Sequence, residues 1–290
     1  MNAAGRIAVV VLTHNRRAEL LRTLGHLYAA GEAAAVCVVD NGSSDGSSDA
    51  VARRFPAARL IRLAGNHGAA GRNHGVRAVD TPYVAFCDDD TWWAPGALAR
   101  AAELLDRQPR LAAVTARVLV GREEREDPTS TLMAASPLPN GLLQAGTTAV
   151  AGLLAGACAV RREAFLAAGG YEPRLFLGGE EQLLSLDLMA AGWHLAYAPQ
   201  LVVHHHPSSR RDVGKRHRLL LRNALWCAWL RRPLASALRE TLRRLRAAAH
   251  DPGLAHALGG ALRGLPWVLR QRRVIPAHLE AQLQLLERQG

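Results

Sequence analysis

Three short apolar runs alternate with helical segments in the first third of the chain, and this alternation restricts the fold more than any other feature. The runs at residues 7–12, 36–39 and 83–87 are continuous, as in strands buried on both faces of a sheet. The segment 18–30 carries leucines at helical spacing, and 44–55 opens with serine and aspartate residues that suit a helix N-terminus. Alternating strands and helices predict an α/β fold with a doubly wound, Rossmann-like, mostly parallel sheet.

Charge divides the chain into two parts. Residues 1–206 hold 19 basic and 20 acidic side chains, whereas residues 207–290 hold 17 basic and 5 acidic ones. The second part is also leucine-periodic and is interrupted by prolines, which predicts a basic helical C-terminal extension. We therefore expect one α/β domain over 1–206 and a separate extension over 207–290.

The positive extension predicts an anionic partner, either a phospholipid surface or a polyanionic acceptor. A helical tail that is merely solvated remains an alternative, and nucleic acid is the less favoured partner. The four cysteines are widely spaced, three of them in apolar runs, and are interpreted as reduced core residues. No signal segment and no long apolar run precedes the first strand, so we expect a cytoplasmic protein, with peripheral contact at the inner face of the membrane as an option.

Polar residues follow each apolar run, where a doubly wound sheet binds its ligands. Thr13-His14-Asn15-Arg16 follows the first run, 40–46 follows the second, and Asp88-Asp89-Asp90 follows the run at 83–87. Three adjacent carboxylates repel one another unless a cation or sugar hydroxyls lie beside them, and hard oxygen ligands suit Mg²⁺ or Mn²⁺ bridging a diphosphate. A helix N-terminal cap cluster is the alternative explanation of one or two of them.

The motifs at 11–16, 38–45, 65–75 and 86–90, taken together, resemble the family-2 inverting glycosyltransferases, which have the GT-A fold and use nucleotide sugars. The resemblance covers residues 7–206 and implies a donor half at about 1–120 and an acceptor half at about 121–206. It implies that Asp40 binds the nucleobase, although the 40–45 segment alone is also typical of a turn and cap. The expected donor-binding residues are Thr13, Asn15, Arg16, Asp40, Asn41, Arg72, Asn73, Asp88 and Asp89, and the expected metal ligands are Asp90, Asp88, His204 and His206.

The acceptor half contains a departure from the family's pattern. The family usually places a Glu-Asp pair at the start of a helix as the source of the general base, whereas this chain has Glu180-Glu181 followed by Gln182. Alignment by position favours Glu181 as the base and leaves Glu180 as its alternative; both also suit a helix N-terminus. In the strand-like run that ends at His206, alternation puts His204 and His206 on one side and His205 on the other.

These features predict an inverting hexosyl- or deoxyhexosyltransferase of bacterial polysaccharide or glycoconjugate biosynthesis. It would use Mn²⁺ or Mg²⁺ and a UDP-, dTDP- or GDP-sugar, and would act on a carbohydrate, lipid-linked or small-molecule acceptor. One rival is a sugar-phosphate nucleotidyltransferase, whose usual glycine-rich, lysine-bearing N-terminal loop the chain lacks. The other is a membrane- or polyanion-binding module, suggested by the charge of the extension and by Trp226, Trp229 and Trp267.

Overall fold

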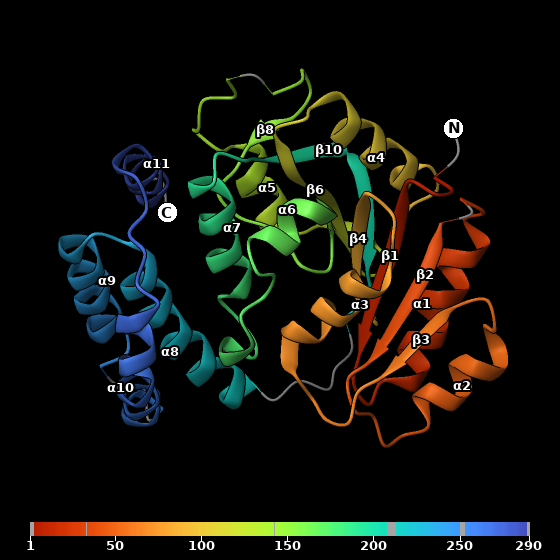
Figure 1. Ribbon diagram of the computed structural model, residues 1–290, viewed down its shortest axis with the longest axis horizontal. Coiled ribbons are helices and arrows are strands. Elements are labelled where there is room, and N and C mark those ends of the chain that lie inside the picture. Colours follow the sequence, from red (N-terminus) through yellow and green to blue (C-terminus); the bar gives the residue numbers. More distant parts are fainter. Residues whose placement is uncertain (1–2, 33, 142, 208–212, 250–252, 289–290) are drawn as a thin grey trace.

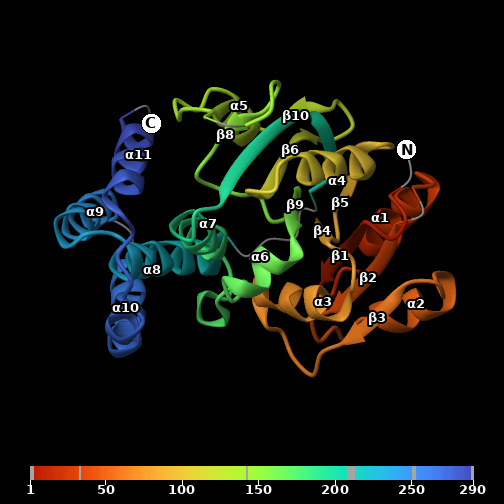
Figure 2. The same cartoon turned by 45° about the horizontal axis from the view of Figure 1, so that its top comes forward.

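The structure, a computed structural model, describes residues 3–32, 34–141, 143–207, 213–249 and 253–288, without the side chains of 213–215. Its strands are β1 (Ile7–Thr13), β2 (Ala35–Asp40), β3 (Arg59–Arg62), β4 (Tyr83–Asp88), β5 (Thr91–Trp93), β6 (Leu111–Val120), β7 (Arg125–Glu126), β8 (Thr148–Ala149), β9 (Cys158–Arg161) and β10 (His194–His205). They form one sheet in the order β3-β2-β1-β4-β9-β6-β10-β5, with β7 paired to β6 and β8 to β10. Helices cover both faces of this sheet (Figures 1 and 2).

The first half of the sheet is parallel throughout, as the sequence pattern predicts. β1 lies between β2 and β4, and β3 follows β2 at the edge. The register pairs Thr13 with Asp40 and Leu12 with Asp88, so the polar residues that follow these strands come together at one edge. The helices of this half are α1 (Arg17–Ala29), α2 (Ser47–Arg54), the 3-10 helix η1 (Gly68–Gly71), α3 (Arg72–Ala78) and α4 (Ala97–Arg107).

The second half of the sheet is mixed. β9 is antiparallel to both β4 and β6, β10 is parallel to β6, and β5 is antiparallel to β10. The helices here are α5 (Pro128–Ala134), α6 (Arg162–Ala167), the 3-10 helix η2 (Pro173–Leu175) and α7 (Glu180–Ala190). The sheet is therefore parallel where the strand-helix alternation repeats and mixed beyond it.

The core consists of two apolar layers, one on each face of the sheet. Along β1, Val9 and Val11 pack with α1 and α4, whereas Ala8 and Val10 pack with the α3, α6 and α7 side, because successive residues of a strand point to opposite faces. The four cysteines are buried and unpaired, as expected for core thiols. The glycine-rich segment has a packing role: a Cβ atom at Gly75 would lie 2.5 Å from Val10, so the absence of a side chain lets α3 lie close to the sheet.

The described residues of the C-terminal extension form four helices beside α7, at the end of the molecule opposite to β3 and α2 (Figures 1 and 2). They are α8 (Val213–Arg231), α9 (Leu234–Ala247), α10 (Leu254–Arg270) and α11 (Ala277–Glu287). No helix among the described residues combines the length and hydrophobicity that crossing a bilayer requires. α8 packs against α7, so the extension is attached directly to the α/β domain.

The three tryptophans of the extension pack between its helices: Trp226 is buried and Trp229 and Trp267 are half-buried, and their contact with a membrane stays a prediction. Trp226 is 8% exposed, stacks edge-on against Trp267 and donates from Nε1 to the carbonyl oxygen of Ala261 at 3.0 Å. Trp229 donates from Nε1 to Thr241 Oγ1 at 3.0 Å. Their indoles hold α8 to α9 and α10, since a large ring with one polar atom stabilises helix packing when that atom finds a partner.

Candidate active site

A cavity of about 600 Å³ lies at the carboxyl ends of β1 and β4. Its walls come from segments far apart in the sequence: the end of β1 (Thr13, His14, Arg16), the end of β4 (Asp88, Asp89, Asp90), η1 and α3 (Gly68, Ala69, Arg72), the turn 155–156, the segment 176–181 and the start of α8 (Arg216, Leu219, Leu220). The α/β domain and the extension therefore share this cavity. Sequence reasoning missed the three residues of α8, because a leucine-periodic helix carries no sign of what its faces contact.

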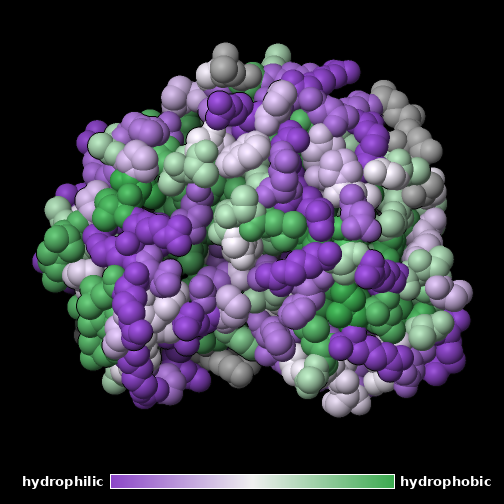
Figure 3. All heavy atoms as spheres, in the orientation of Figure 1, coloured by the Kyte–Doolittle hydropathy of each residue, from purple (hydrophilic) through white to green (hydrophobic). Residues whose placement is uncertain are grey.

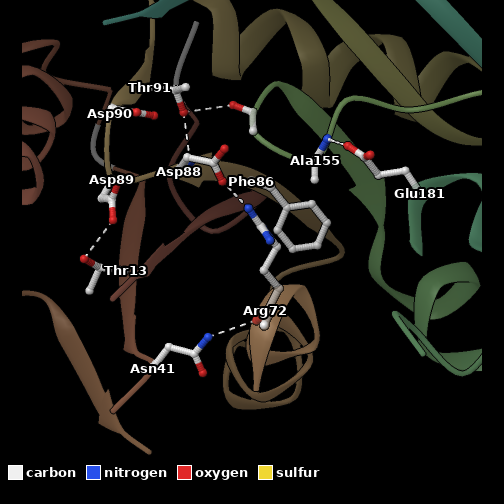
Figure 4. Close-up of polar contacts among 12 residues, drawn as sticks. Thr13, Asn41, Arg72, Phe86, Asp88, Asp89, Asp90, Thr91, Ala155 and Glu181 are labelled. Atoms are coloured by element: carbon white, nitrogen blue, oxygen red, sulfur yellow. Dashed lines mark hydrogen bonds and ion pairs between the residues drawn. The ribbon is translucent and has the colours of Figure 1, made fainter. Parts of the chain in front are cut away.

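The three aspartates at the end of β4 meet two arginines in the cavity. Arg72 forms an ion pair with Asp88 (Figure 4), and Arg16 Nη1 lies 3.4 Å from Asp89 Oδ1 and 3.0 Å from Asp90 Oδ2. Arg72 is buried, which opposes its charge, but Asp88 outweighs that effect and the pKa of the guanidinium is raised. The side chain of Asp88 is 42% exposed, against 9% and 5% for the other two, so it is the carboxylate most open to a ligand.

Asp89 supports the turn after β4. Its Oδ2 accepts a hydrogen bond from Thr13 Oγ1 at 3.0 Å, and its main-chain oxygen accepts one from Thr23 Oγ1 at 2.8 Å. Burial raises the pKa of this carboxyl to about 7, against the lowering effect of Arg16. Thr13 and Asp89, both expected at the donor, thus line the cavity but bond to each other.

Two glutamates stand where α7 begins, after Gly178 and Gly179, which have positive φ angles of 86° and 88°. Glu180 is 4% exposed, and its Oε2 has no hydrogen-bond partner among the described residues. Glu181 Oε1 accepts a hydrogen bond from the N–H of Ala155 at 2.5 Å (Figure 4). Burial raises the pKa of both carboxyls, and Glu180 further raises that of Glu181, to about 7. A carboxylate with a pKa near 7 is suited to accept a proton at neutral pH.

Helix α8 holds the loop 174–179 that leads into α7. Asn223 is fully buried and donates through Nδ2 to the carbonyl oxygens of Leu175 at 2.7 Å, Leu177 at 3.1 Å and Gly178 at 2.5 Å. Arg222 Nη2 also donates to the Leu175 oxygen, at 3.1 Å. A buried carbonyl needs a hydrogen-bond donor, and here that donor belongs to the extension. Sequence reasoning did not single out Asn223.

The sequence model of the protein family described as glycosyl transferase family 2 matches residues 8–169, which is more than half of the chain. The chain belongs to this family. It is therefore a glycosyltransferase. This result excludes the two alternative classes, which were a nucleotidyltransferase and a binding module without transferase activity. The chain is 28% identical, over 81% of its own length and 90% of the relative's, to a protein of Mycobacterium tuberculosis named N-acetylglucosaminyl-diphospho-decaprenol L-rhamnosyltransferase.

Solved structures share the GT-A fold with this family member. The mannosyltransferase PcManGT from Pyrobaculum calidifontis, solved in complex with GDP-Man and Mn²⁺, matches with a TM-score of 0.58 and 21% identity over 97% of this chain and 86% of that chain. GalNAc-T7, solved with UDP, GalNAc and Mn²⁺, matches with a TM-score of 0.60 and 16% identity over 78% of this chain. The match spans about half of the GalNAc-T7 chain, at 48%. At these identities the likeness establishes the fold.

Two asparagines expected at the donor of this glycosyltransferase do not line the cavity. Asn73 donates from Nδ2 to the carbonyl of Tyr171 at 2.8 Å and accepts from its N–H at 3.0 Å, so its amide joins α3 to the 169–171 turn. Asn15 Oδ1 accepts from the N–H of Ser44 at 2.8 Å and lies at the surface. Asn41 does line the cavity, but its amide bonds to the 66–68 segment. These amides are occupied in shaping the loops, so the donor-binding role of Asn15 and Asn73 stays a prediction that the lining of the cavity does not support.

Asp40 lies beside a second, smaller cavity of about 260 Å³. Its Oδ1 accepts from the N–H of Ser43 at 2.8 Å, and its Oδ2 accepts from the hydroxyl of Ser48. This is the turn-and-cap role that the sequence left open for the segment. The register places Asp40 next to Thr13, so a nucleotide that extends past the end of β1 would come close to Asp40. Binding of the base by Asp40 stays a prediction.

The expected histidine ligands lie elsewhere. His204 Nδ1 is 3.4 Å from Glu124 and its ring stacks on Trp92, and His206 also contacts Trp92, with ring centroids 4.7 Å apart. His205 instead directs Nε2 to within 3.6 Å of Asp90 Oδ1. His204 and His206 lie on one side of the strand and His205 on the other, as predicted. However, the side that faces the carboxylates is that of His205. Of the three imidazole rings, that of His205 lies beside the Asp90 carboxylate, whereas His206 meets Asp90 through its main-chain N–H, which donates to the Asp90 carbonyl oxygen at 2.9 Å.

The carboxylates fit a divalent metal whose coordination shell is completed by substrate oxygens. Among the described residues no group of three or more histidine, cysteine, aspartate or glutamate side chains is arranged to hold a metal by itself. Mg²⁺ and Mn²⁺ are usually held by one or two protein carboxylates together with waters and substrate phosphates. Asp88 and Asp90 supply such a hard oxygen pair on the cavity wall, so the donor set suits a metal that arrives with a diphosphate.

Proposed function

We propose that this glycosyltransferase moves a sugar from a nucleoside-diphosphate sugar to an acceptor hydroxyl with inversion of configuration at the anomeric carbon. The observation that carries the proposal is the pairing of two chemistries in one cavity. Charged residues at the end of β4 lie on one side, and a glutamate with a pKa raised to about 7 lies on the other (Figure 4). A leaving group and a base on opposite sides of a sugar ring favour direct displacement.

Glu181 acts as the general base in this proposal. It takes the proton of the acceptor hydroxyl as the acceptor oxygen bonds to the anomeric carbon, and the bond to the diphosphate oxygen breaks on the opposite face. The nucleoside diphosphate leaves with the bonding electron pair, so one displacement gives one inversion. Glu180 contributes by raising the pKa of Glu181, which makes Glu181 a stronger base than an exposed carboxylate.

The donor side relies on charge. Asp88 and Asp90 would hold Mn²⁺ or Mg²⁺, which supplies neutralisation of the negative charge that develops on the leaving diphosphate. Arg16 and Arg72 already lie against these aspartates and offer guanidinium groups to phosphate oxygens. The Mn²⁺ in the two structural relatives supports a divalent metal in this fold.

We further propose a deoxyhexosyl or hexosyl donor and a lipid-linked acceptor. The support is the relative named for transfer of L-rhamnose to a diphospho-decaprenol-linked sugar, which matches along 90% of its length. A test is a panel of UDP-, dTDP- and GDP-sugars, each added with Mn²⁺ while thermal unfolding is followed. The true donor at about 100 times its Kd stabilises the fold by about 2.7 kcal/mol, and the others do not.

The stereochemistry is checked on the product. With the selected donor and an acceptor, NMR of the new linkage should show the anomeric configuration opposite to that of the donor sugar. Release of nucleoside diphosphate by the wild type and not by Glu181→Gln links the turnover to the proposed base. A product of retained configuration would refute direct displacement, and a panel in which no nucleotide sugar shifts unfolding would refute the choice of donor class.

A further inference from the structure

Helices α9 and α10 direct leucines to the solvent. Leu234, Leu238 and Leu242 of α9 are 60%, 51% and 52% exposed. Their spacing of four residues puts them on one side of the helix. The opposite, buried side of α9 carries Ser236, Ala237 and Glu240, so the large apolar side chains point outward and the small and polar ones inward. This is the reverse of the arrangement that stabilises a helix on a protein core.

α10 repeats the arrangement. Leu262, Leu265 and Leu269 are 67%, 37% and 56% exposed. The helix packs on α8 through small or buried residues: Ala257, Ala261, Gly264 and Val268. A Cβ atom at Gly264 would lie 2.3 Å from the ring of Trp226, so this contact requires glycine. Over α9 and α10, Figure 3 shows hydrophobic side chains at the surface beside hydrophilic ones.

Arginines follow the exposed leucines directly in the sequence. Arg239 follows Leu238, and Arg263 and Arg270 follow Leu262 and Leu269. No carboxylate of the described residues pairs with Arg239, Arg246, Arg263 or Arg270. The extension's glutamates bond elsewhere, Glu240 to Arg243 and Arg244 and Glu280 to Arg232. We call the six leucines of α9 and α10 and these four arginines the leucine–arginine surface.

Helix α8 contacts both α10 and the cavity. Leu219 and Leu220 of α8 line the cavity, and the next residue, Leu221, belongs to an apolar cluster with Ala257 of α10. The helix that carries part of the leucine–arginine surface therefore packs on the helix that forms part of the cavity wall.

We propose that the leucine–arginine surface docks the enzyme on an anionic lipid bilayer. Leucine side chains are stabilised when they insert at the boundary of the acyl chains, and arginines without a carboxylate partner are stabilised by anionic headgroups. An anionic bilayer therefore suits both the leucines and the arginines of the surface. A nucleic acid would pair with the arginines but would leave the leucines in water. Docking would bring a lipid-linked acceptor close to the cavity, and this consequence rests on the proposed function. The docking itself does not depend on that function.

The experiment is flotation of the full chain with vesicles of phosphatidylcholine alone and of phosphatidylcholine mixed with phosphatidylglycerol, without nucleotide sugar or acceptor. The wild type should float with the mixed vesicles and much less with phosphatidylcholine alone. The double variant Leu238→Gln/Leu242→Gln should lose about tenfold in partitioning for each leucine that inserts. The matched control is Leu132→Gln, since Leu132 is 70% exposed on α5 of the catalytic domain, and it should float as the wild type does.

A second pair of variants tests the charge. Arg239→Gln/Arg263→Gln should weaken flotation and its dependence on salt, because screening acts on headgroup attraction. Turnover of a water-soluble acceptor should stay within twofold of the wild type in all these variants, which separates docking from catalysis. Docking is overturned if the leucine variant floats as well as the wild type, or if the Leu132 control loses as much. It is also overturned if the leucines instead hold a dimer that the variant dissociates in the absence of lipid. Failure of every nucleotide sugar with intact flotation would refute the proposed function alone.

Discussion

Replacing Glu181 by glutamine should give an enzyme that is more stable and less active than the wild type. Burial and Glu180 raise the pKa of Glu181 from 4.5 to about 7. Each pKa unit corresponds to about 1.4 kcal/mol, so the ionised form costs the fold about 3 kcal/mol. The native carboxyl binds its proton more tightly than the unfolded one. Stability is therefore lost as pH rises from about 4.5 to 7, and the full loss remains above pH 7.

The variant should separate the two effects. Glutamine keeps the size of the side chain and can still accept the hydrogen bond from the N–H of Ala155, but it takes no proton. We expect kcat to fall by about 10²–10⁴, the usual contribution of a general base. Wild-type kcat should fall as pH drops below about 7, since the base must be ionised. Urea unfolding should show the variant more stable by up to about 3 kcal/mol at pH 8 and nearly equal to the wild type at pH 4.5.

The matched control is Glu180→Gln, because Glu180 is its buried neighbour and also has a raised pKa. This variant should also gain stability at pH 8 while keeping kcat within about tenfold of the wild type, since Glu181 retains its carboxylate. The reasoning fails if Glu181→Gln turns over at the wild-type rate, or if it is no more stable than the wild type at pH 8. If Glu180→Gln is the inactive one, the base has been placed one residue too late.

Three further predictions concern other parts of the site. Asn223→Leu leaves the Leu177 and Gly178 carbonyls without their donor, while Leu175 keeps Arg222, and should lower the unfolding free energy by about 3 kcal/mol in urea melts; an unchanged melt would show that water replaces the amide. Asp90→Asn should abolish Mn²⁺-dependent donor turnover while the thermal unfolding transition stays cooperative, and retained Mn²⁺-dependent turnover would contradict the metal assignment. His205→Ala should weaken the apparent affinity for Mn²⁺ in activity titrations more than His204→Ala, because the His205 ring lies beside the Asp90 carboxylate and the His204 ring lies beside Glu124; equal effects would count against that orientation.

The sequence was informative where its signals are local. Continuous apolar runs predicted β1, β2 and β4, and strands that are neighbours in a parallel sheet bring their carboxyl ends together. The sequence therefore predicts that Arg16, Asp88 and Asp90 lie close together, as the structure shows. Placing the glutamates at a helix start was also possible, because α7 begins where glycines end the preceding loop.

The rest depends on register and on contacts between distant segments. The face that His205 presents follows from its pairing with Thr91 and from a register shift between Ala198 and Val202, neither of which alternation alone specifies. The bonds from Asn223 to the loop 174–179 join residues more than forty positions apart. Asn73 looked like a ligand-binding amide because its partner, the backbone of Tyr171, carries no sequence signature. Single positions of this kind are decided by tertiary contact.

The bonds from α8 to the loop before α7 limit how the chain can be recombined with its relatives. A chimera that takes residues 1–206 from this protein and a foreign C-terminal segment would keep every residue of the carboxylate group and both glutamates. It would nevertheless lose the amide that satisfies the Leu175, Leu177 and Gly178 carbonyls, together with the α8 portion of the cavity wall. Exchanging acceptor preference by swapping tails should therefore fail unless the 174–179 loop is transplanted with the helix that holds it.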